Sequence, residues 1–263
     1  MSRLCDYRLI YGIVNPDFVL SLARGLQVIE AFHEKAEGLS VTKASERTKL
    51  SRAAVRRLLI TLESLGYAER RGSTFVLTSR VLRLGFSFVT SNSMAVLAVP
   101  LLEQLSAGIH ESCSVSVLDG GQIVYLARAA AKRVMTIDLG VGSRLPAYCT
   151  SMGRVLLAAL PAEELPRHLG RAKLKALTPK TIVDRGQLVK VLHQVRAQGY
   201  ALVDQELELG LRSIAVPVTS RLGRVVAAMN SGVSAARVSR AELVERILPE
   251  LTHHARLLGQ LLT

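Results

Sequence analysis

Apolar residues recur at helical spacing in the first third of the chain and predict three helices there. Segment 21–32 places apolar side chains at positions 22, 26, 29 and 32, on one face of a helix. Residues 41–48 form a second, very short predicted helix with Ser40 as its cap. Ser51 is a favourable N-cap for a third helix. The apolar face of this third helix consists of Val55, Leu58, Leu59, Leu62 and Leu65.

A two-residue turn beyond the third helix predicts a β-hairpin. Gly66 ends the helix, and segments 67–71 and 74–77 have the pattern of short strands around Gly72-Ser73. Helix, short helix, tight turn, helix and hairpin is the order of a winged helix-turn-helix. In that fold the third helix enters the major groove of DNA, and the hairpin contacts the neighbouring backbone. The outer face of the third helix carries Ala53, Arg57 and Ile60, flanked by Arg52 and Arg56.

Residues 79–111 have a mostly helical pattern that is interrupted by the polar segment Ser91-Asn92-Ser93. A helix that is apolar on one side needs a partner, so this segment is expected to join two domains and to pack on a second subunit. We therefore expect a flexible tail over 1–17, a winged helix-turn-helix domain over 18–79, a helical linker over 80–111 and a second domain over 112–263.

From Ser112 onward the hydrophobic pattern alternates with a period of two and predicts strands. Segments 113–118 and 122–127 flank Asp119-Gly120-Gly121, which is a strong hairpin signal. Further strands are expected over 133–138, 200–204, 213–218 and 224–230. Helices are expected over 150–160 and 184–198, and a terminal helix follows a capping box at Ser239 and contains a kink at Pro249. The predicted fold class is α+β, an antiparallel sheet with helices packed around it.

The charge of the chain suggests a partner for the first domain. The chain has 34 Lys and Arg against 21 Asp and Glu, a net charge of +13, which favours a nucleic acid or an acidic membrane surface. Six basic side chains and one acid fall within residues 43–57, on the predicted helix-turn-helix, and this location favours DNA. Arginine can bond a guanine edge in two places or neutralise a phosphate. The residues expected to contact double-stranded operator DNA are Lys43, Ser51, Arg52, Ala53, Arg56 and Arg57, with Arg70 and Arg71 on the wing.

Composition argues against several other classes of protein. Hydrophobic residues make up 49% of the 263 residues, enough for packed cores. No apolar run reaches the roughly 18 residues of a membrane span, and no signal peptide is recognisable, so a cytoplasmic protein without membrane contact is expected. Cys5, Cys113 and Cys149 have neither disulfide-framework nor zinc spacing. No cofactor and no metal site are expected.

The sequence contains no strong catalytic set. Cys149 and Ser151 can be nominated as nucleophiles, but no nucleophile-elbow motif surrounds Ser151 and no metal-ligand spacing links the histidines. We therefore expect a protein that is not an enzyme. Two alternatives stay open: a DNA-binding protein without sequence preference or ligand control, and a hydrolase or transferase using Cys149 or Ser151.

A glycine-rich loop over residues 139–150 runs into the start of a predicted helix. Exposed N–H groups at a helix start favour an anion such as a carboxylate. Thr150 and Ser151 add hydroxyl groups, and Arg144 can add positive charge. A capped helix without a ligand is the alternative interpretation of this segment.

Several strings of residues resemble the IclR family of bacterial transcriptional regulators. They are Ser21-Leu-Ala-Arg-Gly-Leu, the winged helix-turn-helix, the segment Leu145–Ala158 and the segment Asp204–Pro217, in the family's order. Asn15-Pro-Asp-Phe18, Arg52–Arg57 and the Tyr-Cys-Thr-Ser-Met-Gly string are similar, more narrowly, to the PcaR/PcaU/PobR branch. That branch controls genes for protocatechuate, 4-hydroxybenzoate and the β-ketoadipate pathway.

This resemblance implies an N-terminal DNA reader and a GAF-like C-terminal effector-binding domain. It also implies homodimers formed through the N-terminal and linker helices, often paired as dimers of dimers, and control by a small carboxylate effector. Val203 stands where the wider family usually has an acidic residue or a serine, and this more apolar lining would suit a different ligand from the small keto acids bound elsewhere in the family. The effector-binding residues that the resemblance implies, with their neighbours in sequence, are Val134, Ile137, Arg144, Leu145, Tyr148, Thr150, Ser151, Met152, Arg212 and Ser213.

Overall fold

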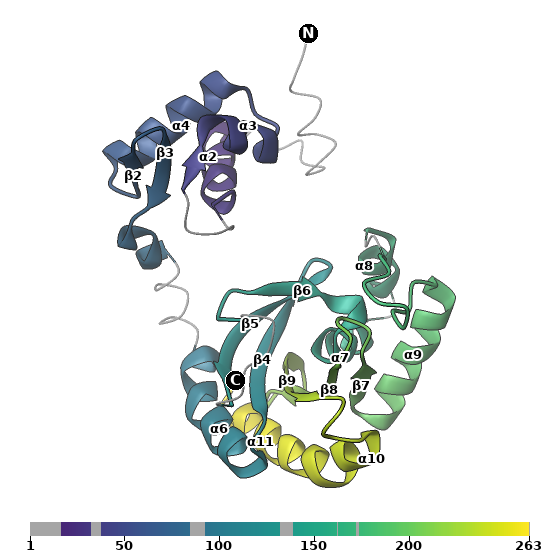
Figure 1. The fold of residues 1–263 in the computed structure, drawn as a ribbon. Helices are drawn as coiled ribbons and strands as arrows, with labels where there is room; N and C mark the ends of the chain where they lie inside the picture. The colour runs from purple at the N-terminus through teal and green to yellow at the C-terminus, as the bar shows by residue number, and fades with distance from the viewer. Residues whose placement is uncertain are drawn as a thin grey trace. The chain divides into compact units, whose positions relative to one another are not determined.

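The computed structural model describes residues 17–32, 38–84, 93–131, 139–161, 163–171 and 174–262. The chain forms two compact units that divide between residues 88 and 89 (Figure 1). Each unit has its own hydrophobic core, and each is described by itself below.

The first unit is built on three helices whose ends carry strong local signals. These helices are α2 (Leu20–Glu30), α3 (Val41–Thr48) and α4 (Arg52–Ser64). The Oγ atoms of Ser40 and Ser51 accept hydrogen bonds from backbone N–H groups in the first turns of α3 and α4, as the sequence predicts. Lys49, at the turn between them, adopts a left-handed φ of 57° that lets the chain reverse within three residues.

A small sheet completes this unit and forms the predicted wing. Its strands are β1 (Leu39–Ser40), β2 (Ala68–Arg71) and β3 (Thr74–Leu77), in the order β1-β3-β2. Arg71 pairs with Thr74 across the predicted two-residue turn, where Gly72 has a φ of +61°. A 3₁₀ turn over Ser79–Val81 follows. The two-residue strand β1 was not predicted, because it is too short to show a period.

The second unit is a six-stranded antiparallel sheet with helices on both faces. The strand order is β6-β5-β4-β9-β8-β7. The strands are β4 (Ser112–Asp119), β5 (Gln122–Ala129), β6 (Arg144–Pro146), β7 (Ala201–Asp204), β8 (Leu211–Thr219) and β9 (Val225–Ser234). The helices are α6 (Ser93–Ile109), α7 (Ser151–Ala159), α8 (Leu165–Arg171), α9 (Arg185–Gln198), α10 (Arg240–Glu242) and α11 (Leu248–Gln260). A 3₁₀ turn over Ala147–Cys149 leads into α7.

Two layers of helices bury the two faces of this sheet (Figure 1). α6 and α11 cover one face, and buried Leu102, Leu105, Leu251 and Leu258 lie in the core on that side. α7 and α9 cover the opposite face, where Met152, Leu156, Leu188 and Leu192 form a second core. The architecture is therefore α+β, as predicted.

The sequence predicted most of these elements, with shifts at their ends. The hairpin of β4 and β5, helices α7 and α9, and the Ser239–Glu242 capping box are confirmed. Strands β8 and β9 are longer than predicted, and β6 and α8 were not predicted. The strand expected over 133–138 lies outside the described residues. A π-helical turn over Leu243–Ile247 precedes Pro249 in the terminal helix, and it accommodates a residue that cannot donate a backbone hydrogen bond.

The structure places the predicted linker in two different surroundings. The 3₁₀ turn at its start belongs to the first unit, whereas α6 packs against the sheet of the second unit. Residues 85–92 lie outside the described residues.

Candidate functional site

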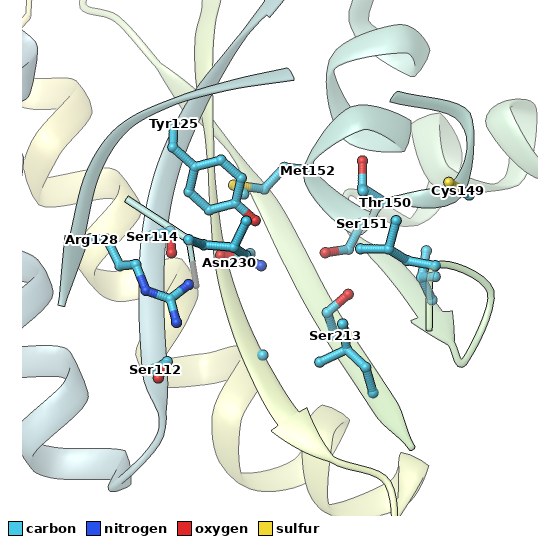
Figure 2. Close-up of a pocket in the computed structure, with 15 residues that line it drawn as sticks. Ser112, Ser114, Tyr125, Arg128, Cys149, Thr150, Ser151, Met152, Ser213 and Asn230 are labelled. Carbon is cyan, nitrogen blue, oxygen red and sulfur yellow. The ribbon is translucent and has the colours of Figure 1, made fainter. Parts of the chain in front are cut away.

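A pocket lies between the sheet of the second unit and the start of α7 (Figure 2). Its empty space, including the open solvent at its mouth, is about 540 Å³. Two rows of paired residues form its floor, and directly paired residues on neighbouring strands point to the same face of a sheet. One row runs Arg128, Ser114, Asn230 across β5, β4 and β9, and the other runs Ser112, Gly232, Ser213 across β4, β9 and β8.

Small residues leave room above this floor. Gly232 has no side chain, and the nearest atom that a Cβ there would meet is Leu211 Cδ1 at 3.9 Å. The cavity is bounded by larger apolar side chains that come from β5, β7, β8, α7 and the loops, namely Tyr125, Leu139, Met152, Val203, Leu207 and Leu211. The lining is therefore mostly apolar, with polar groups at separate positions.

The start of α7 is held close to the preceding turn. The Thr150 hydroxyl accepts a hydrogen bond from Gly153 N and caps the helix. A Cβ on Gly153 would lie 2.2 Å from the carbonyl oxygen of Ala147, so only glycine fits this approach. The Ser116 hydroxyl on β4 contacts Met152 Sδ at 3.1 Å. These contacts fix Ser151 and Met152 against the sheet.

Two buried polar atoms of the pocket have no hydrogen-bond partner among the described residues. They are Ser151 Oγ and Asn230 Oδ1, in residues that are 1% and 9% exposed. Buried polar groups in proteins are nearly always paired, so these two atoms indicate a site for a bound molecule or water.

Among the described residues that line the pocket, Arg128 is the one charged residue and none is acidic. Its side chain is half-buried, and within the described part of the chain it makes no ion pair. The cavity therefore carries a formal charge of +1, which favours an anionic ligand.

Burial keeps the other ionisable groups of the lining neutral. Burial raises the pKa of the Cys149 thiol to about 12, although the nearby Arg154 guanidinium acts in the opposite direction. Burial likewise raises the pKa of the Tyr125 phenol to about 12. Both groups are protonated at neutral pH, so neither supplies negative charge to the pocket.

A buried ion pair supports the loop at the mouth of the pocket. Arg154, 2% exposed on α7, donates to both carboxylate oxygens of Glu206 at 2.7 and 2.6 Å and to the Tyr148 carbonyl at 2.9 Å. Glu206 Oε2 also accepts from Ile182 N at 3.1 Å. Because Leu207 follows Glu206 directly, this pair ties a lining residue to the helix that bears Ser151 and Met152.

The predicted effector residues fall into three groups. Thr150, Ser151, Met152 and Ser213 line the pocket together. Val134 and Ile137 lie outside the described residues. The remaining four, Arg144, Leu145, Tyr148 and Arg212, are not among the lining residues.

Each of these four has other partners in the structure. Arg144, on the outer strand β6, forms an ion pair with Asp119 at 2.6 Å, and Leu145 packs against the core below α7. The Tyr148 hydroxyl donates to the Lys175 carbonyl at 2.7 Å. Arg212 pairs with Asp204 at 2.9 Å; burial alone would raise the pKa of this carboxyl, but hydrogen bonds from Arg212 and Gln205 outweigh it and lower the pKa.

Sequence reasoning missed the residues of β4, β5 and β9 in the pocket. Arg128, Ser114 and Asn230 meet through strand pairing over about a hundred residues of chain. The alternation Ser112, Ser114, Ser116 in an otherwise apolar strand is a signal that one face of β4 is not ordinary core.

The predicted DNA-contacting residues lie on the surface of the first unit. Lys43, Ser51, Arg52, Ala53, Arg56, Arg57, Arg70 and Arg71 are all exposed. The Ser51 hydroxyl caps α4, and Arg71 pairs with Glu69. Arg57 also lines an apolar groove between α2 and α4, whereas Arg56 does not.

In the described part of the chain, no three His, Cys, Asp or Glu side chains are grouped so that they could hold a metal ion. No helix within those residues has the length and apolarity needed to cross a membrane.

Comparison with known proteins shows the class to which this fold and site belong. Residues 21–72 match the IclR helix-turn-helix domain, and residues 86–259 match the family described as bacterial transcriptional regulator IclR C-terminal. The chain therefore belongs to the IclR family of bacterial transcriptional regulators.

Within that family, two relatives and two structures are informative. The chain is 49% identical over 243 residues to the Pca regulon regulatory protein of Pseudomonas putida, covering 92% of this chain and 84% of that protein. It is 38% identical over 254 residues to the p-hydroxybenzoate hydroxylase transcriptional activator of Acinetobacter baylyi, covering 95% and 94%. A crystal structure from Rhodococcus sp. RHA1 matches with a TM-score of 0.80 and 46% identity, covering 92% and 98% of the two chains. The inducer-binding domain of Acinetobacter PobR, solved as a double mutant with 3-hydroxybenzoic acid, matches with a TM-score of 0.60 and 36% identity, covering 63% and 97%.

Proposed function

We propose that this protein is a sequence-specific transcriptional regulator of genes for aromatic-acid catabolism, controlled by a small carboxylate effector and acting in the cytoplasm. The observation that carries the proposal is the 49% identity to a Pca regulon regulatory protein over 92% of the chain. The effectors that we consider are protocatechuate, 4-hydroxybenzoate and β-ketoadipate. Each would bind the pocket of the second unit and shift the protein between states of different DNA affinity.

The charge of the pocket supports an acidic effector. Its described lining contains one cation and no acid, and the apolar walls suit a carbon skeleton. A related inducer-binding domain, 36% identical, was solved with a hydroxybenzoic acid. Among the predicted effector residues, Thr150, Ser151, Met152 and Ser213 line this pocket, and this supports their role in binding the effector.

For DNA, we propose that α4 enters the major groove and that the wing contacts phosphates. Arg52, Ala53 and Arg56 present small and basic side chains beside the capped start of α4. Lys43, Ser51 and Arg57 lie beside them, and Arg70 and Arg71 extend from β2. The exposure and charge of these residues support this assignment.

We propose that the active form is a homodimer in which two copies of the first unit contact each other. An apolar groove whose empty space, including open solvent, is about 1260 Å³ separates α2 from α4. Leu22, Leu26 and Leu65 on its rim are 62%, 48% and 53% exposed, which is unusual for a surface without a partner. A second copy of this unit would cover these side chains and set the spacing of two DNA half-sites. We further propose that two such dimers associate as a dimer of dimers.

The chemistry of the pocket argues against the enzyme alternative. A nucleophilic cysteine needs a thiolate, but the pKa of Cys149 is raised by burial to about 12. Ser151 Oγ has no base within hydrogen-bond distance among the described residues. We therefore propose that the pocket binds its ligand without converting it.

Selection of duplexes from a random pool, followed by fluorescence anisotropy, tests the proposal. We expect a two-fold symmetric consensus, bound about a thousandfold or more tightly than unrelated DNA. One of the three acids should change that affinity by about 5- to 150-fold. The Ser151→Leu variant should bind the consensus duplex with wild-type affinity, but the acid should no longer change that affinity. Binding without sequence preference and without any effect of the acids would instead support the alternative of a ligand-independent DNA-binding protein.

A further inference from the structure

The polar groups of the pocket lie at two ends, and this arrangement implies an orientation for the ligand. In Figure 2, Arg128 with Ser112 and Ser114 stands on one side, and Ser151 with Ser213 stands on the other. β5 and β8, which carry Arg128 and Ser213, are separated by three strand spacings, about 14 Å at the usual 4.8 Å per spacing. A ligand that satisfies both ends therefore needs polar groups at opposite ends of its skeleton.

Among the described residues, no carboxylate pairs with the half-buried guanidinium of Arg128. Two acids in the described part of this unit are already bound by other arginines: Asp204 by Arg212 and Glu206 by Arg154. Removing a charge from water is costly unless a counter-charge is supplied, so an acidic ligand gains most by pairing here. The planar guanidinium can also bond both oxygens of one carboxylate.

The floor beside Arg128 offers further donors to that carboxylate. Ser114 is paired directly opposite Arg128 and is 2% exposed. The oxygen of Ser112 accepts a hydrogen bond from Ala131 N, so its hydroxyl proton is left to donate. This end of the pocket therefore combines a full positive charge with hydroxyl donors.

The end at α7 suits a neutral polar group instead. A helix start supplies only about half a positive charge, and the Thr150 hydroxyl already accepts a bond from the first turn of α7. The unpartnered Ser151 Oγ can both donate and accept, which matches a hydroxyl group. A carboxylate bound at α7 would leave Arg128 without a counter-charge.

We propose that the pocket binds a hydroxybenzoate-class acid with its carboxylate on Arg128 and its hydroxyl group on Ser151 at the start of α7. This inference rests on the proposed function and adds the orientation and the specificity-determining residues. The apolar walls formed by Tyr125, Met152 and Leu211 lie along the ring between the two ends.

Isothermal titration of the full chain with three matched compounds tests this orientation. 4-Hydroxybenzoate has both polar groups, 4-hydroxybenzamide lacks the charge, and benzoate lacks the hydroxyl. Arg128→Gln should weaken binding of 4-hydroxybenzoate by about 10- to 100-fold and change binding of the amide by less than about threefold. Ser151→Ala should reduce the preference for 4-hydroxybenzoate over benzoate by about fivefold or more.

Arg144→Gln is the matched control, because it removes a guanidinium from the same unit but outside the pocket. It should leave the affinities for all three compounds unchanged, and thermal melting should show that every variant folds. Suppose that wild-type protein binds 4-hydroxybenzoate, but Arg128→Gln leaves the ratio of the affinities for 4-hydroxybenzoate and 4-hydroxybenzamide unchanged. The proposed orientation is then wrong, while the proposed function stands. The orientation is also wrong, and the proposed function again stands, if Ser151→Ala rather than Arg128→Gln removes the preference for 4-hydroxybenzoate over 4-hydroxybenzamide. If wild-type protein does not bind 4-hydroxybenzoate, the proposed orientation fails. The proposed function fails as well only if protocatechuate and β-ketoadipate also leave the DNA affinity unchanged.

Discussion

Removing Arg154 should destabilise the second unit far more than removing an exposed arginine. Arg154 donates two hydrogen bonds to Glu206 and one to the Tyr148 carbonyl, and both charged side chains are more than 90% buried. Arg154→Met would leave the Glu206 carboxylate buried with only the Ile182 N–H as a donor. Breaking a buried pair on one side costs about 3–5 kcal/mol of unfolding free energy. For a domain of this size that corresponds to a fall in Tm of about 6–20 °C.

A double-mutant cycle separates the interaction energy between Arg154 and Glu206 from the packing energy of each side chain. Arg154→Met, Glu206→Met and the double variant are unfolded in urea and followed by circular dichroism, since the chain has no Trp for fluorescence. The double variant should be more stable than the sum of the single losses predicts, because no unpaired charge remains. Arg144→Met, which breaks an exposed pair, is the control and should cost at most about 1 kcal/mol. Equal losses for Arg154→Met and Arg144→Met, or strict additivity in the cycle, would refute the reasoning.

Three further predictions concern packing, DNA and pH. Gly153→Ala should cost about 1–3 kcal/mol in urea unfolding because its Cβ would lie 2.2 Å from the Ala147 oxygen, whereas Gly140→Ala, in open space, should cost little. Arg56→Ala should weaken binding to the selected operator by about 1–3 kcal/mol if the side chain contacts a base, and unchanged anisotropy would exclude it from the interface. Because the folded-state pKa of Asp204 is lowered, the stability it contributes is complete above about pH 4 and is lost as pH falls through the lowered pKa. Asp204→Asn should therefore be less stable than wild type at pH 7, and the gap should shrink near pH 3; a gap independent of pH would contradict this.

Local signals allowed much of the fold to be predicted from the sequence. Ser40 and Ser51 cap α3 and α4 because a hydroxyl at that position accepts a bond from an N–H three residues on. Gly199 ends α9 with a left-handed φ of 79°, and Gly72 turns the wing. Each of these signals acts within four or five residues, so the sequence alone contains it.

The pocket was predicted only where it depends on such local signals. Ser151 and Met152 follow directly from the helix start that the glycine-rich loop leads into. Arg128 could not be found in the same way, because its neighbours Ser114 and Asn230 come from strands whose register depends on the whole sheet. Arg144 is close in sequence to the helix start, but the outer strand β6 carries it to a pair with Asp119.

The central pairing of β4 with β9 also determines when each unit can form during synthesis. It joins residues 112–116 to residues 228–232, so the sheet cannot close until nearly all of the chain has left the ribosome. In the first unit, every strand pair joins residues within 39–77, and such contacts require only short loops to close. The first unit, which matches a helix-turn-helix domain, can therefore fold while the second unit, the proposed effector-binding part, is still being made. A chain cut short before β9 would carry a folded first unit without the control that its second unit supplies.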